Sequence, residues 1–159
     1  MAGMIKTAAI CLAAGAACAR LARHRAEKKL QGQKKETDKY YDDYQLLSHW
    51  MEMKHGRGNT ADYFRAKGYK EIAIYGMGEL ANRLCEELRN TEIRVAYGVD
   101  RDVCNTISRM DKVYSPDDEL MAVDAIVVTP FYAMESIRKQ LSVKVACPIV
   151  SLEEVVWSL

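Results

Sequence analysis

From residue 68 onward, the hydrophobic pattern alternates between two periods. Three short runs are almost wholly apolar, as in strands buried on both faces: "KEIAIYG" (70–76), "IRVAYGVD" (93–100) and "VDAIVVTP" (123–130). Two shorter runs, "KVYS" (112–115) and "CPIVS" (147–151), also predict strands.

Helical segments separate these strands. The stretch 79–90 carries leucines at 80, 84 and 88 on one helical face, and 132–141 predicts another helix. Ser115 with Pro116 is a helix-start signal, and Ser151 with Glu154 forms a capping box before a last helix. Strands that alternate with helices predict a doubly wound parallel sheet, and we expect the strand order 3-2-1-4-5.

The chain before residue 68 predicts helices only. Between residues 25 and 54 the one glycine is Gly32, and there is no proline. Residues at three- and four-residue spacing predict an amphipathic face: Tyr40, Tyr44, Leu47, Trp50, Met51 and Lys54. Gly56 and Gly58 end this helix, and a short helix with Asn59 or Thr60 as its cap runs to Gly68. We therefore divide the chain into an apolar segment (1–24), a helical extension (25–67) and an α/β domain (68–159).

The apolar run "TAAICLAAGAACA" (7–19) is followed at once by the basic cluster "RLARHRAEKK". The run is shorter than the ~20 residues of a straight membrane span, but the cluster would hold its carboxyl side in the cytoplasm. We rank a membrane contact through residues 1–20 above a water-exposed Ala-rich helix, and a cleaved signal peptide third. The expected location is the cytoplasm, with a tether to the inner face of the cell membrane.

The composition narrows the class of protein. Apolar residues make up 49% of the chain and charged residues 28%, with a formal net charge of +1. These values are ordinary for a globular protein and do not favour a nucleic-acid partner. The five cysteines include no C-x-x-C pair, which argues against a zinc site or a disulfide framework and for a reducing compartment.

The candidate chemistry lies in "IAIYGMGELANRL" (72–84), where Gly76, Gly78 and Ala81 match G-x-G-x-x-G/A. Such a turn lets the backbone approach a pyrophosphate, and the helix that follows points its free N–H groups at it. Asp100 ends the second strand 24 residues past Gly76, where an acid would accept ribose hydroxyls. The predicted cofactor-binding residues are Gly76, Met77, Gly78, Glu79, Leu80, Asp100, Arg101 and Thr129.

Two features bear on the ligand. Glu79 lies in the first helical turn, where its carboxylate would compete with a pyrophosphate unless the side chain swings outward. Asp100 favours the ribose diol of NAD, whereas Arg101 and Arg109 would accept the 2′-phosphate of NADP. S-adenosylmethionine sites use a similar turn and acid and stay open as an alternative.

No catalytic constellation accompanies the turn. Tyr63 and Lys67 have the Y-x-x-x-K spacing of short-chain dehydrogenases, but they precede the first strand, and we interpret the match as coincidence. The α/β part is about half of a full dinucleotide domain. We therefore expect binding without turnover.

The segment Trp50 to Asp102, with "VDAIVVTP" and "CPIVSLEEVV", resembles small Rossmann-like proteins and modules encoded among bacterial capsule and cell-envelope glycan genes. The part "KEIAIYGMGELANRL…GVD" is also similar to the amino-terminal nucleotide-sugar-binding domain of bacterial sugar acyltransferases. The resemblance implies that Gly76, Gly78 and Asp100 contact a nucleotide or nucleotide-sugar. It does not imply acyl transfer, since the chain has no hexapeptide-repeat region.

These observations predict a Rossmann-like module that binds NAD or a nucleotide-sugar and assists envelope polysaccharide synthesis. One alternative is an oxidoreductase or epimerase that acts on a nucleotide-sugar and is completed by a partner chain. The other is an adaptor without a ligand, whose 25–54 helix pairs with itself or with a glycosyltransferase.

Overall fold

The computed structural model describes residues 2–56, 58–104, 106 and 110–159, with the backbone alone for residues 2–19. The chain divides into two compact units, Met1–Tyr44 and Gln45–Leu159.

Helix α1 (Ala2–His55) provides the described part of the first unit. It runs through Gly32 without a break, because a single glycine inside a helix costs only about 1 kcal/mol. Every residue from 20 to 38 is exposed. Across the described residues, no helix combines the length and apolarity needed to cross a bilayer.

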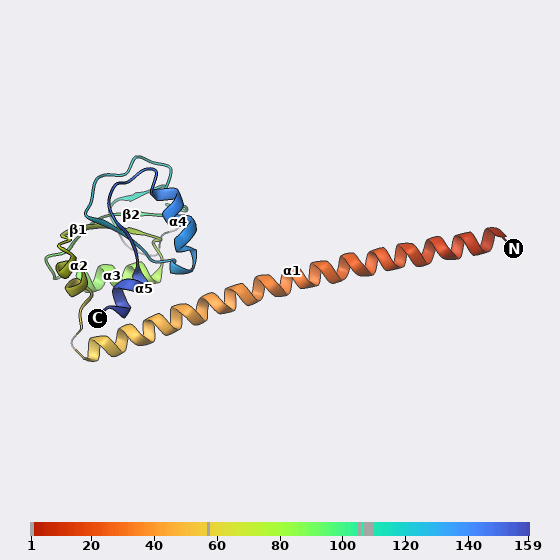
Figure 1. Ribbon diagram of the computed structural model, residues 1–159, viewed down its shortest axis with the longest axis horizontal. Coiled ribbons are helices and arrows are strands. Elements are labelled where there is room, and N and C mark those ends of the chain that lie inside the picture. Colours follow the sequence, from red (N-terminus) through yellow and green to blue (C-terminus); the bar gives the residue numbers. More distant parts are fainter. Residues whose placement is uncertain (1, 57, 105, 107–109) are drawn as a thin grey trace. The chain divides into compact units, whose positions relative to one another are not determined.

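The second unit is built on a five-stranded parallel sheet (Figure 1). Its strands are β1 (Glu71–Tyr75), β2 (Arg94–Val99), β3 (Val113–Tyr114), β4 (Ala125–Val128) and β5 (Ile149–Ser151). Their order, β3-β2-β1-β4-β5, confirms the predicted α/β fold and strand order. The order reverses between β1 and β4, which is where ligands of such sheets usually bind.

Alternate residues of the central strands pack on opposite faces of the sheet. Ile72 and Ile74 belong to a core shared with α2 (Thr60–Lys67), α3 (Glu79–Leu88), α5 (Leu152–Trp157) and the end of α1. Ala73 and Tyr75 belong to a second core with α4 (Met134–Leu141), which follows a short 3-10 helix, Phe131–Ala133. Because both faces are covered, the central strands are almost wholly apolar, as the sequence pattern indicated.

Local end signals set several boundaries. The Asn59 side chain accepts the Ala61 N–H at 2.9 Å to begin α2, and Gly68 ends it with φ of 76°. Ser151 caps α5 by accepting the Glu154 N–H at 3.0 Å. The Glu154 carboxylate accepts a hydrogen bond from the Tyr63 hydroxyl at 2.7 Å, and this contact links α5 to α2. The serine of the predicted capping box thus caps α5, while its glutamate binds α2.

Two local expectations were wrong. No helix follows Pro116; the segment closes as a turn, because the Asp118 carboxylate accepts the Ser115 N–H at 2.8 Å. Between residues 20 and 55 of α1, the buried residues are Leu46 and Trp50, at 2% and 3% exposure, whereas Tyr40, Tyr44 and Met51 are more than 60% exposed. The amphipathic list named Trp50 and the partly buried Leu47, which packs on the same core, and it missed Leu46.

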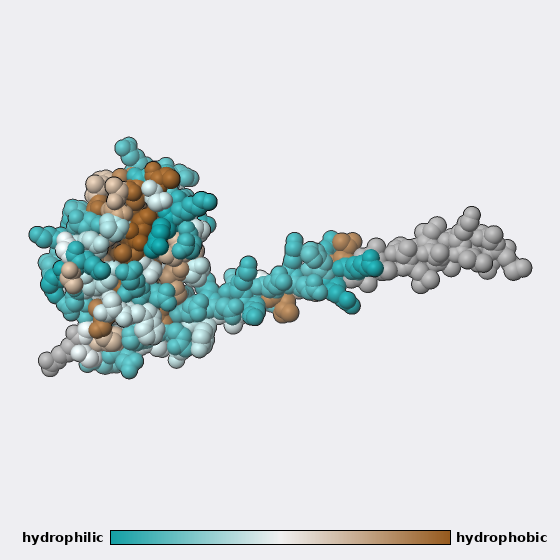
Figure 2. All heavy atoms as spheres, in the orientation of Figure 1, coloured by the Kyte–Doolittle hydropathy of each residue, from teal (hydrophilic) through white to brown (hydrophobic). Residues whose placement is uncertain are grey.

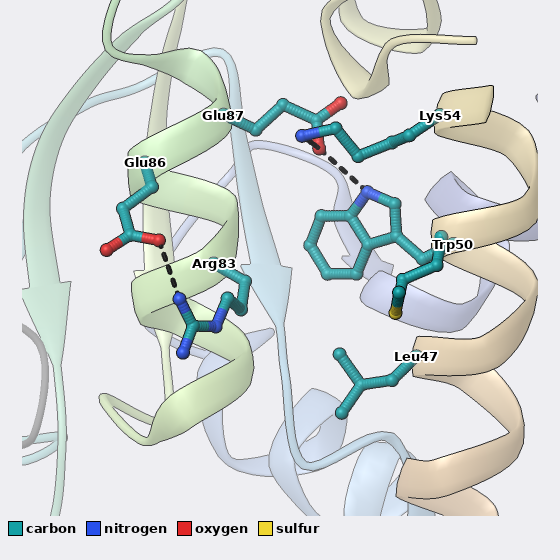
Figure 3. A pocket seen from close by; sticks show the side chains of 7 residues that line it. Leu47, Trp50, Lys54, Arg83, Glu86 and Glu87 are labelled. Carbon is teal, nitrogen blue, oxygen red and sulfur yellow. Dashed lines mark hydrogen bonds and ion pairs between the residues drawn. The ribbon is translucent and has the colours of Figure 1, made fainter. Parts of the chain in front are cut away.

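Glu87 of α3 joins three helices. Its side chain is 5% exposed, accepts the Trp50 indole N–H at 2.8 Å and lies 3.4 Å from the Lys54 ammonium (Figure 3). Its other oxygen accepts the Thr60 N–H at 2.9 Å, at the start of α2. Both oxygens are therefore satisfied, as a buried carboxylate requires.

We expect Glu87→Ala to lower the free energy of unfolding by about 2–4 kcal/mol, because two donors lose their acceptor in a buried place. Denaturant unfolding monitored by Trp fluorescence measures it. Glu86→Ala is the matched control: Glu86 pairs with Arg83 at the surface, and its loss should cost less than about 0.5 kcal/mol. Equal losses in the two variants would contradict the role given to Glu87.

Tyr97 of β2 is fully buried, and its hydroxyl donates to the Met121 carbonyl at 2.6 Å. Burial, with smaller effects from neighbouring groups such as Cys147, raises the pKa of Tyr97 from 10.0 to about 12. Between these two pH values the unfolded phenol ionises while the folded one stays neutral.

Stability contributed by neutral Tyr97 should therefore be complete below about pH 10 and be lost as the pH rises toward 12. In Tyr97→Phe, the unfolding free energy should fall less steeply with pH in this window than in the wild type. The difference in slope should correspond to at most about one proton released on unfolding. Urea unfolding at a series of alkaline pH values measures the slope. An unchanged slope would be inconsistent with this assignment.

Candidate functional site

The glycine turn lies between β1 and α3, at the carboxyl edge of the sheet beside the point where strand order reverses. Backbone hydrogen bonds join it to the neighbouring strands: the Gly76 N–H donates to the Val99 carbonyl at 2.8 Å, and the Thr129 N–H donates to the Tyr75 carbonyl at 2.9 Å. The ends of β1, β2 and β4 therefore meet at this turn, as the sequence predicted.

Gly76 has no room for a side chain. Its φ is 89°, and a Cβ would lie 2.5 Å from the Pro130 Cδ and 2.8 Å from the Thr129 Oγ1. Only glycine adopts this conformation readily and permits this close approach. The loop after β4 thus packs directly on the turn.

Thr129 supports the turn from that loop. Its side chain is buried, and its hydroxyl donates to the Gly76 carbonyl at 2.6 Å. Thr129, a predicted cofactor-binding residue, thus lies at the expected edge of the sheet. Its hydroxyl proton is already used in the hydrogen bond to the backbone of the turn.

Asp100 reaches the turn from the end of β2. One carboxylate oxygen accepts the Met77 N–H at 2.6 Å, and the other accepts the Asp102 N–H at 2.9 Å. A carboxylate has about four acceptor sites, so Asp100 retains capacity for ligand hydroxyls. The structure adds a function that sequence reasoning missed, which is to hold the glycine turn.

Arg101 follows directly and is exposed. Its Nε lies 3.5 Å from the Tyr75 hydroxyl, and this hydrogen bond raises the pKa of the guanidinium. Arg109, named as an acceptor for a 2′-phosphate, lies outside the described residues.

The start of α3 is open. A Cβ on Gly78 would meet nothing within 4 Å, and Gly78 caps the helix without a side-chain hydrogen bond. Glu79 is 61% exposed and its carboxylate lies 3.7 Å from the Arg83 guanidinium, one helical turn further along. The carboxylate thus pairs outward and leaves the first N–H groups of the helix to another acceptor.

The remaining predicted residues, Met77 and Leu80, have buried side chains and offer a ligand only their backbone. Met77 fills the space above Gly98 of β2, where a Cβ would lie 2.5 Å from the Met77 Sδ. Sequence reasoning did not single out Gly98. The available signal was a glycine inside a strand, which often marks a close approach.

The other groups considered from the sequence, Tyr63 with Lys67 and a metal site, do not contribute to the glycine turn. The Tyr63 hydroxyl is committed to Glu154 and its pKa is raised by burial, while the Lys67 ammonium lies 5.7 Å from the Tyr63 ring centroid. Within the described ranges, no three His, Cys, Asp or Glu side chains gather as a metal site would require.

Two pockets lie elsewhere in the second unit. One, of about 330 Å³, lies between α1 and α3 beside Leu47 and Trp50 (Figure 3). The other, of about 510 Å³, lies beside Leu88 and Val95. Neither of the two is lined by residues of the glycine turn.

Together these contacts define a small doubly wound α/β unit with a rigid glycine turn and an uncapped helix start. Comparison with protein-family models, with curated proteins and with solved structures gave no match.

Substitutions of Gly76 and Gly78 should change the stability of the protein by different amounts. Gly76→Ala should lower the free energy of unfolding by about 2–4 kcal/mol, because it adds a strained φ and a clash with Pro130. Gly78→Ala, with φ of −90° and open space, should change it by less than about 1 kcal/mol. Thermal or urea unfolding of the two variants measures the difference, and similar losses would contradict this account of the turn.

Proposed function

We propose that the second unit binds a nucleotide, NAD or a nucleotide-sugar, with the diphosphate at the start of α3. The observation that carries the proposal is the uncapped amino end of α3 next to Gly78, where nothing occupies the space a Cβ would take. The helix presents unsatisfied N–H groups and the positive end of its dipole there, and both favour a phosphate.

The outward pairing of Glu79 with Arg83 supports the same proposal. A free carboxylate at this place would satisfy the N–H groups and repel an anion. Its pairing with Arg83 reduces both effects, so the competition anticipated from the sequence is weakened.

The ribose would lie against Asp100, whose position is fixed by the Met77 and Asp102 N–H groups. A carboxylate held in this way is preorganised to accept a diol. This arrangement favours a ligand with free ribose hydroxyls, hence NAD or a UDP-sugar over NADP.

The biological setting in this proposal is bacterial envelope polysaccharide synthesis, in which the protein assists an enzyme. It is supported by the resemblance of the segment from Trp50 to Asp102 to modules of capsule loci. Residues 1–24 would contact the inner face of the cell membrane, and the basic residues Arg20, Arg23 and Arg25, which are exposed, would attract anionic lipid headgroups.

Calorimetry of the full chain against NAD, NADP, S-adenosylmethionine, UDP and UDP-sugars tests the nucleotide site. Gly78→Val should weaken binding at least about tenfold, because the side chain would fill the space over the helix start while the backbone conformation tolerates it. Gly32→Val, a glycine in equally open space in the first unit, is the control and should bind normally.

Glu79→Gln is the companion variant in the same titration. Removal of a negative charge from the first helical turn should strengthen binding of a diphosphate by about two- to fivefold. Absence of saturable binding by the folded wild-type chain across the panel would overturn the proposed function, and so would equal binding by wild type and Gly78→Val.

A further inference from the structure

The part of α1 in the first unit contains a long exposed stretch. Intrinsic helix propensity does not by itself explain the stability of such a stretch. All residues from 20 to 38 are exposed, and so are Tyr40, Tyr41 and Tyr44. Most helical stability in proteins comes from packing of an apolar face, and an isolated helix is marginal in water. On the face drawn in Figure 2 this stretch is mainly hydrophilic, with isolated apolar side chains.

Uncharged residues of this stretch recur in a seven-residue repeat that includes the exposed Leu30, Tyr40 and Tyr44. If Leu30 is taken as position a, the a and d positions between residues 26 and 44 contain no charged residue. Leu30, Tyr40 and Tyr44 are 68%, 68% and 64% exposed. We call this row of a and d positions the helix seam; it consists of Ala26, Leu30, Gln33, Thr37, Tyr40 and Tyr44. Such a repeat is typical of a helix that pairs with another helix.

The charges beside the helix seam are divided along its length. Residues 20–35 contain seven Arg or Lys and one Glu, whereas residues 36–44 contain four acids and one Lys. Two copies aligned in parallel would place basic half against basic half. Two antiparallel copies with Leu30 of one opposite Gln33 of the other place residues 36–43 of each, which hold four acids and one Lys, against residues 20–27 of the other, which hold three Arg and one Glu. Residues 28–35 of the two copies then face one another.

We propose that the helix seam binds a second copy of this chain in antiparallel orientation. With Leu30 of one copy opposite Gln33 of the other, the flanking positions pair as Glu27 with Lys34 and Lys29 with Glu36. Twofold symmetry makes each pair occur twice. None of these four residues forms an ion pair with another described residue of its own chain.

The same alignment places Arg23 of one copy opposite Tyr40 of the other, where a guanidinium can lie over the phenol ring. A parallel pair in register would instead set Lys29 against Lys34 of the second copy, with like charges at two places. The charge pattern thus selects the antiparallel dimer, and this inference does not depend on the nucleotide site.

Sedimentation equilibrium of the full chain tests the proposal. We expect a dimer at concentrations of about 10–100 μM, weakened by high salt because the pairs are exposed. Lys29→Glu/Lys34→Glu and Glu27→Lys/Glu36→Lys should each weaken dimerisation at least about tenfold, since four attractive pairs become repulsive. A mixture of the two variants should restore dimerisation, because every pair is then again of opposite charge.

Circular dichroism of each variant checks that α1 stays helical. Zero-length carbodiimide cross-linking of mixed ¹⁴N and ¹⁵N chains should join Lys29 to Glu36, and Lys34 to Glu27, across copies. Within one helix these partners are two turns apart, about 10 Å, beyond the reach of such a bond. A monomer over the whole concentration range, or a dimer that both charge variants leave unchanged, would overturn the proposal.

Discussion

The close approach of Gly76 to Pro130 and Thr129 is the constraint on which the carboxyl edge of the sheet depends. It brings the loop after β4 against the turn after β1, while the Gly76 N–H bonds β2 at Val99. Three strand ends are therefore held together by one residue without a side chain. The amino end of α3 is aimed by this turn, so the geometry of the candidate site follows from a packing requirement.

Two side chains complete that arrangement, and they illustrate how structure and binding share the same groups. Thr129 donates to the Gly76 carbonyl, and Asp100 accepts the Met77 N–H. A loop fixed by its own protein contacts loses little freedom when a ligand arrives. In the proposed function this rigidity lets backbone N–H groups bind a diphosphate without a dedicated basic side chain.

The two ends of α1 meet different physical demands. In the second unit, Leu46 and Trp50 are buried, and Glu87 satisfies the indole and the start of α2 at once. In the first unit the exposed helix seam has no such core, and its halves carry opposite charge. One continuous helix thus combines a docking segment with a stretch whose pattern fits pairing between copies.

The strands, their order and the position of the glycine turn could be predicted from sequence because each depends on local information. Apolar runs mark strands buried on both faces, right-handed crossovers leave few topologies, and a tight turn before a helix demands glycine. The caps at Asn59, Gly68 and Ser151 were equally local. The failure at Pro116 was local too, since one Asp118 carboxylate closed a turn where a helix start was expected.

The sequence by itself determined the parallel α/β fold and the glycine turn, because periodicity and glycine placement act within a few residues. Tertiary structure alone decided which residues of α1 are buried, since large apolar side chains occur both on the exposed helix seam, as Leu30, and on the buried face, as Leu46. It also decided that Glu79 pairs outward with Arg83 and that Asp100 holds the Met77 N–H. The bond between Asp100 and the turn joins β1 to β2 across the sheet, and no spacing along the chain encodes which acceptor sites such a contact consumes.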